Sequence, residues 1–469
     1  MTRIIVVGAG VSGLAAAARL AARGHEVTVC ESAAQAGGAL AAWRERPDKD
    51  AEPGSGLVFD TGAHMLTLPA AYRDLFIKTA KRGRGAVVRL EDVVDLVPLD
   101  PLRSYLFPDG TRLDLPNASR ARLLTAFDDA LGAGAGAAWL RVLEHGNRVW
   151  NTIRPALIEA PGAGRRPLAR LLRTRAGRAA LTPGRSLDGL TRRWFAHHPA
   201  LGLILDDYAR QAGADPRHAP AALTAHPYIE HAFGAWRIPA GMHTLGTALF
   251  ERAIARGVDF RFGEPVTRIS TSSATASSGR VTGVVLGDGT ELAADVVIAA
   301  VDTAVLARLT GSSEQRLVYS QPVTTLCLAL DDAPAPEMPH ETVLLDETGP
   351  AIRIHVARER PSAWTVHADG DQDPEALLDT IARRGFDVRP RIRARHALRA
   401  ADWEAATGAP GGAAYGPAPR DLRSTLLRSP VAQPTRGLFH TGASARPGAG
   451  LSFAALSGWQ ASELIDPSG

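Results

Sequence analysis

The sequence predicts an α/β fold, and three observations support this prediction. A short β-branched run, Arg3–Val7, has the character of a buried parallel strand. It leads through closely spaced glycines into an alanine-rich helix, Leu14–Arg23, which is followed by a second strand, Glu26–Cys30. Further strand and helix candidates recur after residue 236 and near the C-terminus. Strands that alternate with helices indicate a parallel sheet covered by helices.

The composition is that of an ordinary globular protein with more than one domain. The chain has 469 residues, of which 45% are hydrophobic and 22% charged, and at ~150 residues per domain this length suggests two or three domains. The two cysteines, Cys30 and Cys327, form no C-x-x-C pair, so neither a dithiol redox centre nor a cysteine-based zinc site is expected. We predict a reducing, cytoplasmic location and no metal site.

One N-terminal segment resembles a targeting signal in its hydropathy. Residues 4–22 are almost wholly apolar and follow Arg3, as in a signal peptide. The segment nevertheless contains three glycines and Arg19, and it divides into a β-branched half and an alanine-rich half. A buried strand that turns into a helix accounts for this division, so we expect neither a signal peptide nor a membrane span.

The turn between the first strand and the first helix has the pattern G-x-G-x-x-G over Gly8–Gly13. Gly8 permits a tight turn, Gly10 lets the backbone approach a pyrophosphate, and Gly13 allows the helix to pack closely on the strand. The helix N-terminus offers unpaired N–H groups and the positive end of its dipole to the phosphates. Glu31, which ends the second strand, is placed to accept hydrogen bonds from ribose hydroxyls. These features predict a Rossmann-type dinucleotide site.

The residues after Glu31 favour FAD as the dinucleotide. A Gly37-Gly38 pair follows shortly, and then an extended run, Leu57–Gly62. A glycine pair at this distance is typical of large flavin-dependent oxidases and desaturases, because an extended FAD lies against backbone where side chains would clash. We therefore expect a flavoprotein.

A second nucleotide site would imply NAD(P)H as a partner, and the best remaining match is Gly132–Ala137. The segment before it, Leu123–Leu131, has helical rather than strand character because Asp128 and Asp129 interrupt it. No acidic residue stands at the required distance downstream. We interpret these glycines as a break between helices, so no NAD(P) site is evident and oxygen or a quinone is the expected electron acceptor.

The predicted FAD-binding domain is discontinuous. It is assembled from residues 1–75, 236–314 and 416–469. The last piece contains the strand Gly437–Thr441, a glycine loop at 442–450 and the helix Phe453–Leu464. The intervening residues 76–235, mostly helical, and 315–415, which contain strand candidates, are expected to form a mixed α+β substrate domain. Its helical region would face the substrate or a membrane.

Further motifs outside the nucleotide turn carry a family resemblance. They stand at Tyr105–Gly110, Asp215-Pro216 with Ala219–Ala222, Pro239–Met242 and Gly442–Gly450. Together with the turn, the glycine pair and Phe59–Gly62, they resemble the bacterial phytoene desaturases and their relatives, the carotenoid desaturase family of flavoproteins, over most of the chain. The resemblance implies that flavin takes hydride from an allylic carbon of an apolar isoprenoid, and that loss of a neighbouring proton leaves a new double bond.

The resemblance also implies that the C-terminal loop and helix lie along the flavin ring, where a helix N-terminus stabilises negative charge on the reduced flavin. With the dinucleotide motif, it predicts FAD contacts at Gly8, Gly10, Val11, Ser12, Gly13, Glu31, Ser32, Gly37, Gly38, Ala39, Thr61, Gly62, Ala63, His64, Val266, Gly442, Gly450, Leu451 and Ser452.

Several positions depart from the usual family pattern. Ala39 replaces a common arginine, Ala63-His64 replaces Pro-Thr, Ala240 replaces a glycine, and Arg446 replaces a frequent histidine. The altered positions are expected near the flavin.

His64 and Arg446 are the ionisable residues expected nearest the flavin, and each has two interpretations. In the catalytic one, His64 accepts or shuttles the proton lost beside the hydride and Arg446 stabilises the anionic reduced flavin. In the structural one, His64 is a hydrogen-bonded packing residue and Arg446 contacts a phosphate or a carbonyl.

Residues 165–193 contain nine arginines and one acidic residue, Asp188. Leu168, Leu171 and Leu172 fall on one face of a helix. One interpretation is a basic amphipathic helix that docks on anionic lipid, at the inner face of the cell membrane, so that a membrane-dissolved substrate can enter. The other is a solvated arginine-rich face that packs on the core through its leucines. Few aromatic residues are interleaved, so a nucleic-acid partner is not expected.

Three classes of function follow from these motifs. The first is an isoprenoid or carotenoid desaturase, which the segment Pro447–Gly450 supports. The second is a flavin amine oxidase or natural-product oxidase, which shares the N-terminal motifs but favours an aromatic pair facing the flavin. The third is a flavin-dependent polyene isomerase or a catalytically silent FAD-binding partner, which motif spacing does not separate from the first.

Overall fold

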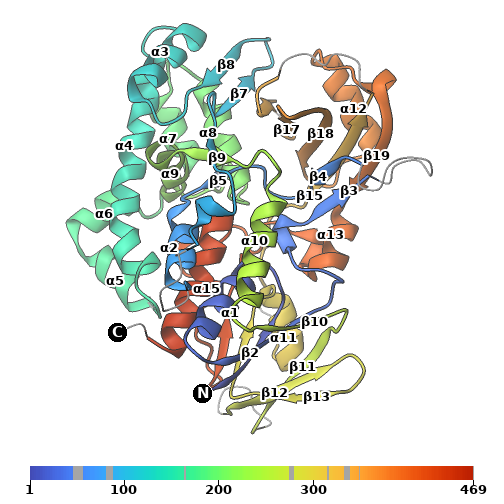
Figure 1. Ribbon diagram of the computed structural model, residues 1–469. Helices are drawn as coiled ribbons and strands as arrows, with labels where there is room; N and C mark the ends of the chain where they lie inside the picture. Colours follow the sequence, from blue (N-terminus) through green and yellow to red (C-terminus); the bar gives the residue numbers. More distant parts are fainter. Residues whose placement is uncertain are drawn as a thin grey trace.

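The computed structural model describes residues 1–45, 56–80, 88–162, 165–273, 279–313, 316–331, 338–347 and 349–467. In the view of Figure 1, a parallel five-stranded sheet lies in the lower part of the molecule. A seven-stranded sheet and a layer of helices lie above it. The predicted α/β class, with a second mixed part, is confirmed.

The five strands of the lower sheet come from three separated stretches of the chain. From edge to edge they are β10 (Asp259–Phe262), β2 (Glu26–Glu31), β1 (Arg3–Val7), β14 (Val296–Ala299) and β20 (Leu438–His440). Every pairing between neighbours is parallel. This arrangement confirms the Rossmann-type unit built from discontinuous segments, whereas the domain boundaries themselves stay a prediction.

Helices and a small antiparallel sheet cover the two faces of the five-stranded sheet. They are α1 (Val11–Ala22), α10 (His243–Ile254), α15 (Leu451–Ile465), α11 (Thr303–Thr310), β11 (Val266–Thr271), β12 (Val281–Leu286) and β13 (Glu291–Ala293). Ile4 and Val6 pack in one core with α1, α10 and α15. Ile5 and Val7 pack on the other face with α11 and β11–β13. Because both faces of β1 are covered, residues 4–7 of the strand are apolar without interruption.

The seven-stranded sheet joins the two stretches between the nucleotide-binding pieces. Its strands, in order, are β19 (Ile392–Leu398), β15 (Val323–Leu330), β18 (Arg360–Asp369), β17 (Ile352–Ala357), β16 (Glu341–Leu344), β7 (Arg103–Leu106) and β8 (Arg112–Leu115). Pairings are antiparallel except that of β16 with β7. Helix α12 (Pro374–Arg383) packs on one face through Leu377, Leu378 and Ile381.

A layer of helices flanks this sheet. Its members are α3 (Arg120–Leu131), α4 (Ala135–Ile153), a π-helical turn (Arg154–Ile158), α5 (Arg165–Arg173), α6 (Arg175–Leu181), α7 (Leu187–Trp194), α8 (Ala200–Gln211) and α9 (Ala225–Phe233). The chain leaves α3 and enters α4 across Gly132 and Gly134, both with φ of 91°. The interpretation of these glycines as a helix break is therefore confirmed.

Short elements connect these layers. They are β3 (Ala42–Arg44), β4 (Val58–Asp60), β5 (Leu66–Thr67), β6 (Val97–Pro98), β9 (Ala235–Arg237), α2 (Ala70–Lys78), α13 (Ala400–Thr407), α14 (Leu422–Leu426), and 3-10 turns at Gly38–Leu40, Leu90–Asp92, Ala221–Thr224, Arg389–Arg391 and Pro410–Gly412.

The two ambiguous segments of the sequence have clear structures. Residues 4–22 form a strand and a helix, as expected, and no helix in the described ranges combines the length and apolarity needed to cross a bilayer. The arginine-rich segment forms three short helices, α5, α6 and α7, instead of one. Leu168 is buried, and Leu171 and Leu172 pack beside it in a cluster that contains Trp150. The leucines therefore do pack on the core.

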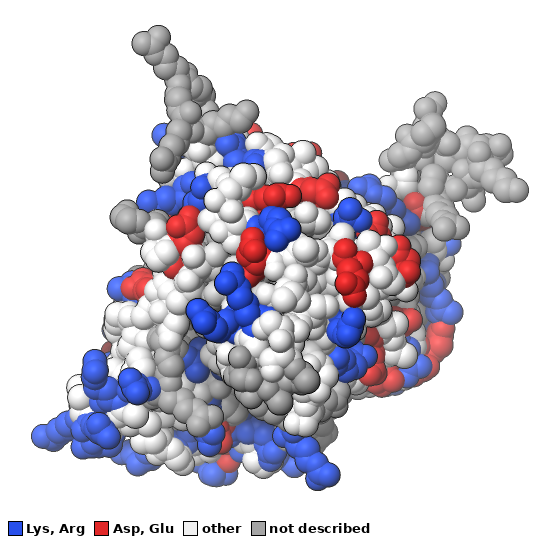
Figure 2. Space-filling model, turned by 90° about the horizontal axis from the view of Figure 1, so that it is seen from below, with Lys and Arg blue, Asp and Glu red and all other residues white. Residues whose placement is uncertain are grey.

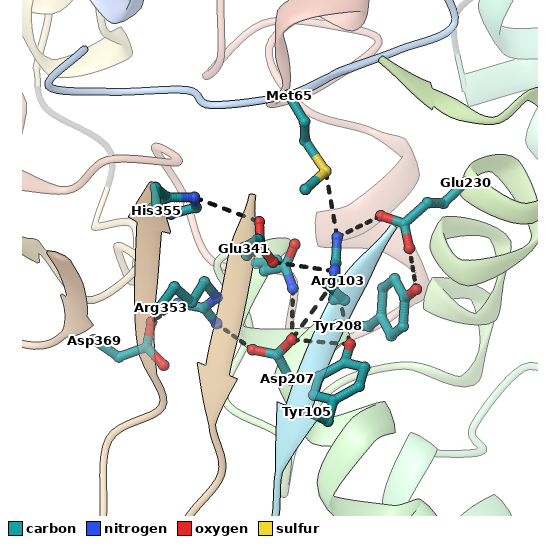
Figure 3. A network of polar contacts seen from close by, with 11 residues as sticks. Met65, Arg103, Tyr105, Asp207, Tyr208, Glu230, Glu341, Arg353, His355 and Asp369 are labelled. Carbon is teal, nitrogen blue, oxygen red and sulfur yellow. Dashed lines mark hydrogen bonds and ion pairs between the residues drawn. The ribbon is translucent and has the colours of Figure 1, made fainter. Parts of the chain in front are cut away.

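A network of buried charges ties the helical layer to the seven-stranded sheet (Figure 3). Arg103 of β7, whose side chain is 0% exposed, pairs with Glu230 of α9 at 2.7 Å and Glu341 of β16 at 3.0 Å. Asp207 of α8 lies 3.8 Å from Arg103 and also pairs with Arg353 of β17. Burial raises the pKa of Glu341 to about 7 in spite of the nearby Arg103.

Replacing Arg103 by methionine should destabilise the fold strongly. The change leaves Glu230, Glu341 and Asp207 buried with one cationic partner fewer, and breaking a buried ion pair from one side costs ~3–5 kcal/mol. Urea unfolding of the variant should show a loss of that size in the free energy of unfolding. Asp188→Asn, which breaks an exposed pair with Arg192, is the control and should cost less than ~1 kcal/mol. Similar losses for both variants would contradict the prediction.

Candidate active site

The glycine turn after β1 sits at the carboxyl edge of the parallel sheet. The Gly8 N–H donates to the Cys30 carbonyl at 2.8 Å, and the Gly37 N–H donates to the Ala9 carbonyl at 3.1 Å. A Cβ on Gly13 would stand 2.1 Å from the Gly8 carbonyl oxygen, so only glycine lets α1 pack this closely on the turn. The predicted contact residues of the turn and of the glycine pair therefore lie together.

Two features of this edge are suited to a bound pyrophosphate. No side chain caps the N-terminus of α1 and its first turn holds no acidic residue, so its free N–H groups and positive dipole end are available to an anion. No atom lies within 4 Å of the position that a Cβ on Gly10 would take. Gly10 therefore presents bare backbone to open space, as the approach of a phosphate requires.

Glu31 ends β2 next to this turn. Its carboxylate accepts hydrogen bonds from the N–H groups of Ala9 at 2.6 Å and Ala33 at 2.9 Å, which fixes it at the mouth of the glycine turn. The Glu264 N–H donates to the Glu31 carbonyl at 3.1 Å, two residues before Val266 begins β11. This grouping suits the ribose and adenine end of a dinucleotide.

The C-terminal segment reaches the same edge from the far end of the chain. The Thr441 N–H donates to the Ala299 carbonyl at 3.0 Å, and the Gly442 N–H donates to the Ser457 hydroxyl at 3.2 Å. Helix α15 begins after Gly450, which has φ of 115°, and no side chain caps its N-terminus. The predicted contacts Gly450, Leu451 and Ser452 thus lie at a second helix end that no side chain caps, whereas Gly442 lies beside the middle of α15 and near Ser12. The Tyr72 hydroxyl holds that end by donating to the Leu451 carbonyl at 2.8 Å.

The segment Thr61–His64 connects the glycine pair to the seven-stranded sheet. The Ala63 N–H donates to the Ala39 carbonyl at 3.3 Å, and the Thr61 hydroxyl donates to the Ala41 carbonyl at 3.0 Å. The Thr61 carbonyl in turn accepts a hydrogen bond from the hydroxyl of Thr325 at 3.2 Å. Ala39, Thr61, Gly62, Ala63 and His64 therefore lie together at the junction of the two sheets, as expected for residues beside a flavin.

Asp60 joins two sequence motifs that the sequence alone did not connect. Its carboxylate accepts hydrogen bonds at 2.8 Å from the N–H groups of Met242 and His243, where α10 begins. The His243 ring contacts the same carboxylate at 2.9 Å. Hydrogen bonding to His243 holds the pKa of Asp60 below its usual value although burial acts in the opposite direction.

Arg446 lies in an apolar pocket that the helical layer shares with the C-terminal loop. The pocket encloses about 760 Å³, its open mouth included. Its lining includes Trp150, Ile153, Leu223, Ile229 and Phe453, together with Arg428, Arg446 and Pro447–Ala449. The pocket therefore ends at the loop that precedes α15. Sequence reasoning missed Arg428 and His226 in this pocket, because neither belongs to a recognisable motif.

His64 lines a different, more polar pocket of about 410 Å³ that also contains Asp60, His340 and His355. Its ring stacks on that of His355, with centroids 3.9 Å apart. The structure thus places the two predicted catalytic residues, His64 and Arg446, in separate pockets. Burial lowers the pKa of His64 well below the usual value, and the neighbouring His367 acts in the same direction.

His440 lies in the last strand, and both of its ring nitrogens have partners within the protein. It is fully buried, with its ring nitrogens near the Ser429 hydroxyl and the Val301 carbonyl, both at 2.9 Å.

Comparison with known proteins identifies the family that has this arrangement. Residues 11–466 match the family described as flavin containing amine oxidoreductases. The chain belongs to this family. It is an FAD-dependent oxidoreductase, and the predicted cofactor, FAD, is confirmed by the family.

The enzyme has relatives among the carotenoid desaturases, which confirms the resemblance seen in the sequence. It is 30% identical to hydroxyneurosporene desaturase of Cereibacter sphaeroides, over 99% of this chain and 97% of that protein. It is also 30% identical to all-trans-zeta-carotene desaturase of Myxococcus xanthus, over 74% of this chain and 63% of that protein. Cyclohexylamine oxidase of Brevibacterium oxydans shares the fold, with a TM-score of 0.60 at 16% identity, over 99% of this chain and 97% of that one.

Two substitutions in the glycine turn separate its role in binding FAD from its role in folding. Gly10→Ala should fold normally, because its φ of −77° suits alanine and the added methyl meets no atom. It should nevertheless bind FAD at least ~10-fold more weakly, a loss of about 1.4 kcal/mol, because the methyl occupies the approach of the pyrophosphate. Gly13→Ala should instead destabilise the protein without its cofactor. FAD titration and thermal unfolding separate the two effects, and unaltered FAD affinity in Gly10→Ala would place the pyrophosphate elsewhere.

Proposed function

We propose that the enzyme introduces C=C bonds into an apolar, carotenoid-type isoprenoid. The observation that carries this proposal is the apolar pocket that ends at the loop before α15, beside the predicted flavin-ring contacts Gly450 and Leu451. Relatives that match nearly the whole chain carry the name hydroxyneurosporene desaturase.

The lining of the pocket supports this substrate class. A polyene offers almost no hydrogen-bonding groups, so it must be held by shape and apolar contact. Trp150, Ile153 and Phe453 provide such contact, exclude water, and would hold a C–H bond at the end of the pocket. Bound FAD supplies a hydride acceptor there. Correct positioning of the reacting bond contributes up to ~7–11 kcal/mol to such reactions.

We further propose different roles for the two predicted catalytic residues. Arg446 is buried at the end of the apolar pocket, where its cationic side chain favours negative charge on the reduced flavin. His64 is a weak base because burial keeps its pKa low. We therefore favour a flavin contact over proton shuttling for His64, and its catalytic role stays a prediction.

The substrate class is tested by adding candidate substrates to the FAD-loaded enzyme without oxygen. Desaturation predicts that the yellow flavin absorbance bleaches with phytoene or a later carotenoid intermediate and that the product absorbs at longer wavelength. An amine such as cyclohexylamine should leave the flavin oxidised. Bleaching by the amine alone would establish an amine oxidase, and polyene isomerisation without bleaching would establish an isomerase.

Arg446→Met provides a variant for the same assay. It should retain FAD and bleach about 10-fold more slowly with the carotenoid, which corresponds to about 1.4 kcal/mol in the barrier. A rate equal to that of the unaltered enzyme would remove Arg446 from the chemistry without affecting the substrate assignment.

We propose oxygen or a quinone as the acceptor that reoxidises the flavin. The best candidate for a second dinucleotide turn is the break between α3 and α4, where Leu131 ends one helix and Ala135 begins the next. This segment lacks the preceding strand that a nicotinamide site requires.

We also propose that the arginine-rich helices dock on the cytoplasmic face of the cell membrane. Arg166, Arg170, Arg173, Arg175, Arg178, Arg185, Arg192 and Arg193 are exposed. Seen from below, basic side chains gather at the left edge, the side on which α5 and α6 lie in Figure 1 (Figure 2). Leu168 of α5 packs in the same cluster as Trp150 and Leu157, which line the apolar pocket. Docking there would bring the pocket close to dissolved isoprenoid.

Membrane docking predicts that the enzyme co-sediments with vesicles that contain anionic lipid and not with neutral ones. The double variant Arg166→Gln, Arg170→Gln should bind roughly 10- to 30-fold more weakly, at ~1 kcal/mol per removed charge. The control, Arg268→Gln with Arg383→Gln, removes two exposed arginines outside these helices and should bind nearly as well as the unaltered enzyme. Equal weakening in both pairs, or no binding to anionic vesicles, would contradict the proposal.

A further inference from the structure

Three histidines from distant parts of the chain meet beside the polar pocket. His64 follows β4, His355 lies on β17 and His367 lies on β18. One ring nitrogen from each is within 4.8 Å of those of the other two. The His64 ring stacks on His355, and the His367 ring lies edge-on to both, with centroids 4.9 Å and 5.1 Å away. Sequence reasoning missed this cluster because its members belong to no common motif.

The pairing of the strands explains why the rings converge. In the register of β17 with β18, His355 lies opposite Thr365 and Arg353 lies opposite His367. Because every second residue of a strand points to the same face, His355 and His367 project from one face of the sheet. The chain at Asp60–His64 packs on that face, where the Thr61 carbonyl lies 3.2 Å from Nε2 of His367.

Several ring nitrogens in the cluster have no hydrogen-bond partner although they are buried. They are Nε2 of His64 and both nitrogens of His355. The His355 side chain is only 6% exposed, so water does not compensate readily. A buried polar atom without a partner is unfavourable, and here three such atoms occur on two adjacent rings. A neutral imidazole has a lone pair on one of its two nitrogens, so His64 and His355 can each offer one lone pair to a ligand.

The remaining contacts of the rings resemble those that orient metal-binding histidines, whose second nitrogen usually faces a carbonyl or carboxylate. His367 has the Thr61 carbonyl, His64 has the backbone of Asp60, and His355 has Glu341 at 3.7 Å from its Nδ1.

We propose that His64, His355 and His367 bind one divalent transition-metal ion of the Zn²⁺ type. Three imidazoles without a thiolate suit Zn²⁺, Co²⁺, Ni²⁺ or Cu²⁺, and the adjoining pocket of about 410 Å³ leaves room for a further ligand. This site departs from the sequence-based expectation of no metal, which rested on cysteine spacing.

Binding requires the rings to rearrange. Metal–nitrogen bonds of about 2.0–2.1 Å bring ligand nitrogens closer together than the present limit of 4.8 Å. A metal lies in the plane of each ligating ring, so His64 and His355 must tilt out of their parallel stack. The ion would then fasten the flavin-contacting segment Thr61–His64 to β17 and β18.

The charges of the network beside the site nearly balance, and Arg353 acts on His355 and His367 in the direction that opposes a cation. The adjacent network contains four carboxylates, from Asp207, Glu230, Glu341 and Asp369. Three arginines face them, Arg103, Arg353 and, at 3.9 Å from Asp369, Arg210. Glu341 belongs to both groups, because it pairs with Arg103 and lies beside His355.

The site is tested with untagged, FAD-loaded enzyme that has been treated with a chelator and dialysed against Co²⁺. We expect one Co²⁺ per chain by elemental analysis, visible cobalt absorbance to the red of the flavin band, and displacement by Zn²⁺. His355→Asn and His367→Asn should each weaken Co²⁺ binding at least ~100-fold, because ligand loss exceeds the 10–100-fold effect of losing an outer partner. Retained flavin absorbance shows that the variants have folded.

His145→Asn is the matched control. His145 is also a buried histidine, but it contacts Thr224, at 2.8 Å, in the helical layer, so this variant should bind Co²⁺ normally. Absence of stoichiometric Co²⁺ in the unaltered enzyme would overturn the proposal, as would Co²⁺ binding in the two ligand variants as tight as in the unaltered enzyme. Because the readout is metal content and absorbance, the result is independent of which substrate the enzyme oxidises.

Discussion

The close contact between α15 and the start of α1 is the constraint on which the site depends. A Cβ on Gly458 would stand 2.4 Å from the Ser12 carbonyl oxygen, so the two helices touch through bare backbone. Gly458 lies seven residues into α15, or about 10 Å from its N-terminus at 1.5 Å per residue. One uncapped helix end therefore lies at the glycine turn and a second lies about 10 Å from the crossing point. An extended dinucleotide can engage both, with its phosphates at α1 and its ring near Gly450.

The buried charges place a second constraint, on how the upper part of the molecule fits together. Removing charged groups from water is costly, and buried pairs are poor evidence of net stability. Their geometry is nevertheless demanding, because Arg103 must reach acids on both α9 and β16. A helical layer shifted along the sheet would leave these charges without partners. The network is therefore better understood as fixing the register of the helices, which line the apolar pocket, against the sheet that carries the histidines.

Sequence patterns predicted those parts of the fold that are determined by residues close together in the chain. The strand Arg3–Val7, the glycine turn and the break at Gly132 follow from backbone and burial requirements that neighbouring residues express. Contacts between residues that are distant in the sequence could not be predicted from such local patterns. Nothing near Asp60 indicates that its carboxylate binds the N-terminus of α10. Nothing near His355 indicates His367, because the register of β17 and β18 brings the two together. The arginine-rich segment differs, because its breaks have local signals that sequence reasoning missed: the side chains of Thr174 and Ser186 cap α6 and α7.

The charges of the ionisable side chains in the apolar pocket bear on which substrate the enzyme accepts. In the apolar pocket, burial lowers the pKa of Arg428 only to about 10, so it stays cationic at neutral pH, and Arg446 lies beside it. Burial, with Arg428 nearby, lowers the pKa of His226 to about 4, so this ring is neutral and holds an added proton poorly. The pocket thus favours negative charge and disfavours a cation. An amine substrate enters as an ammonium ion and would be repelled by both arginines, whereas a polyene carries no charge and meets only the apolar walls. The electrostatics of the pocket therefore favour oxidation of an uncharged hydrocarbon, although amine oxidation is the activity for which the family is named.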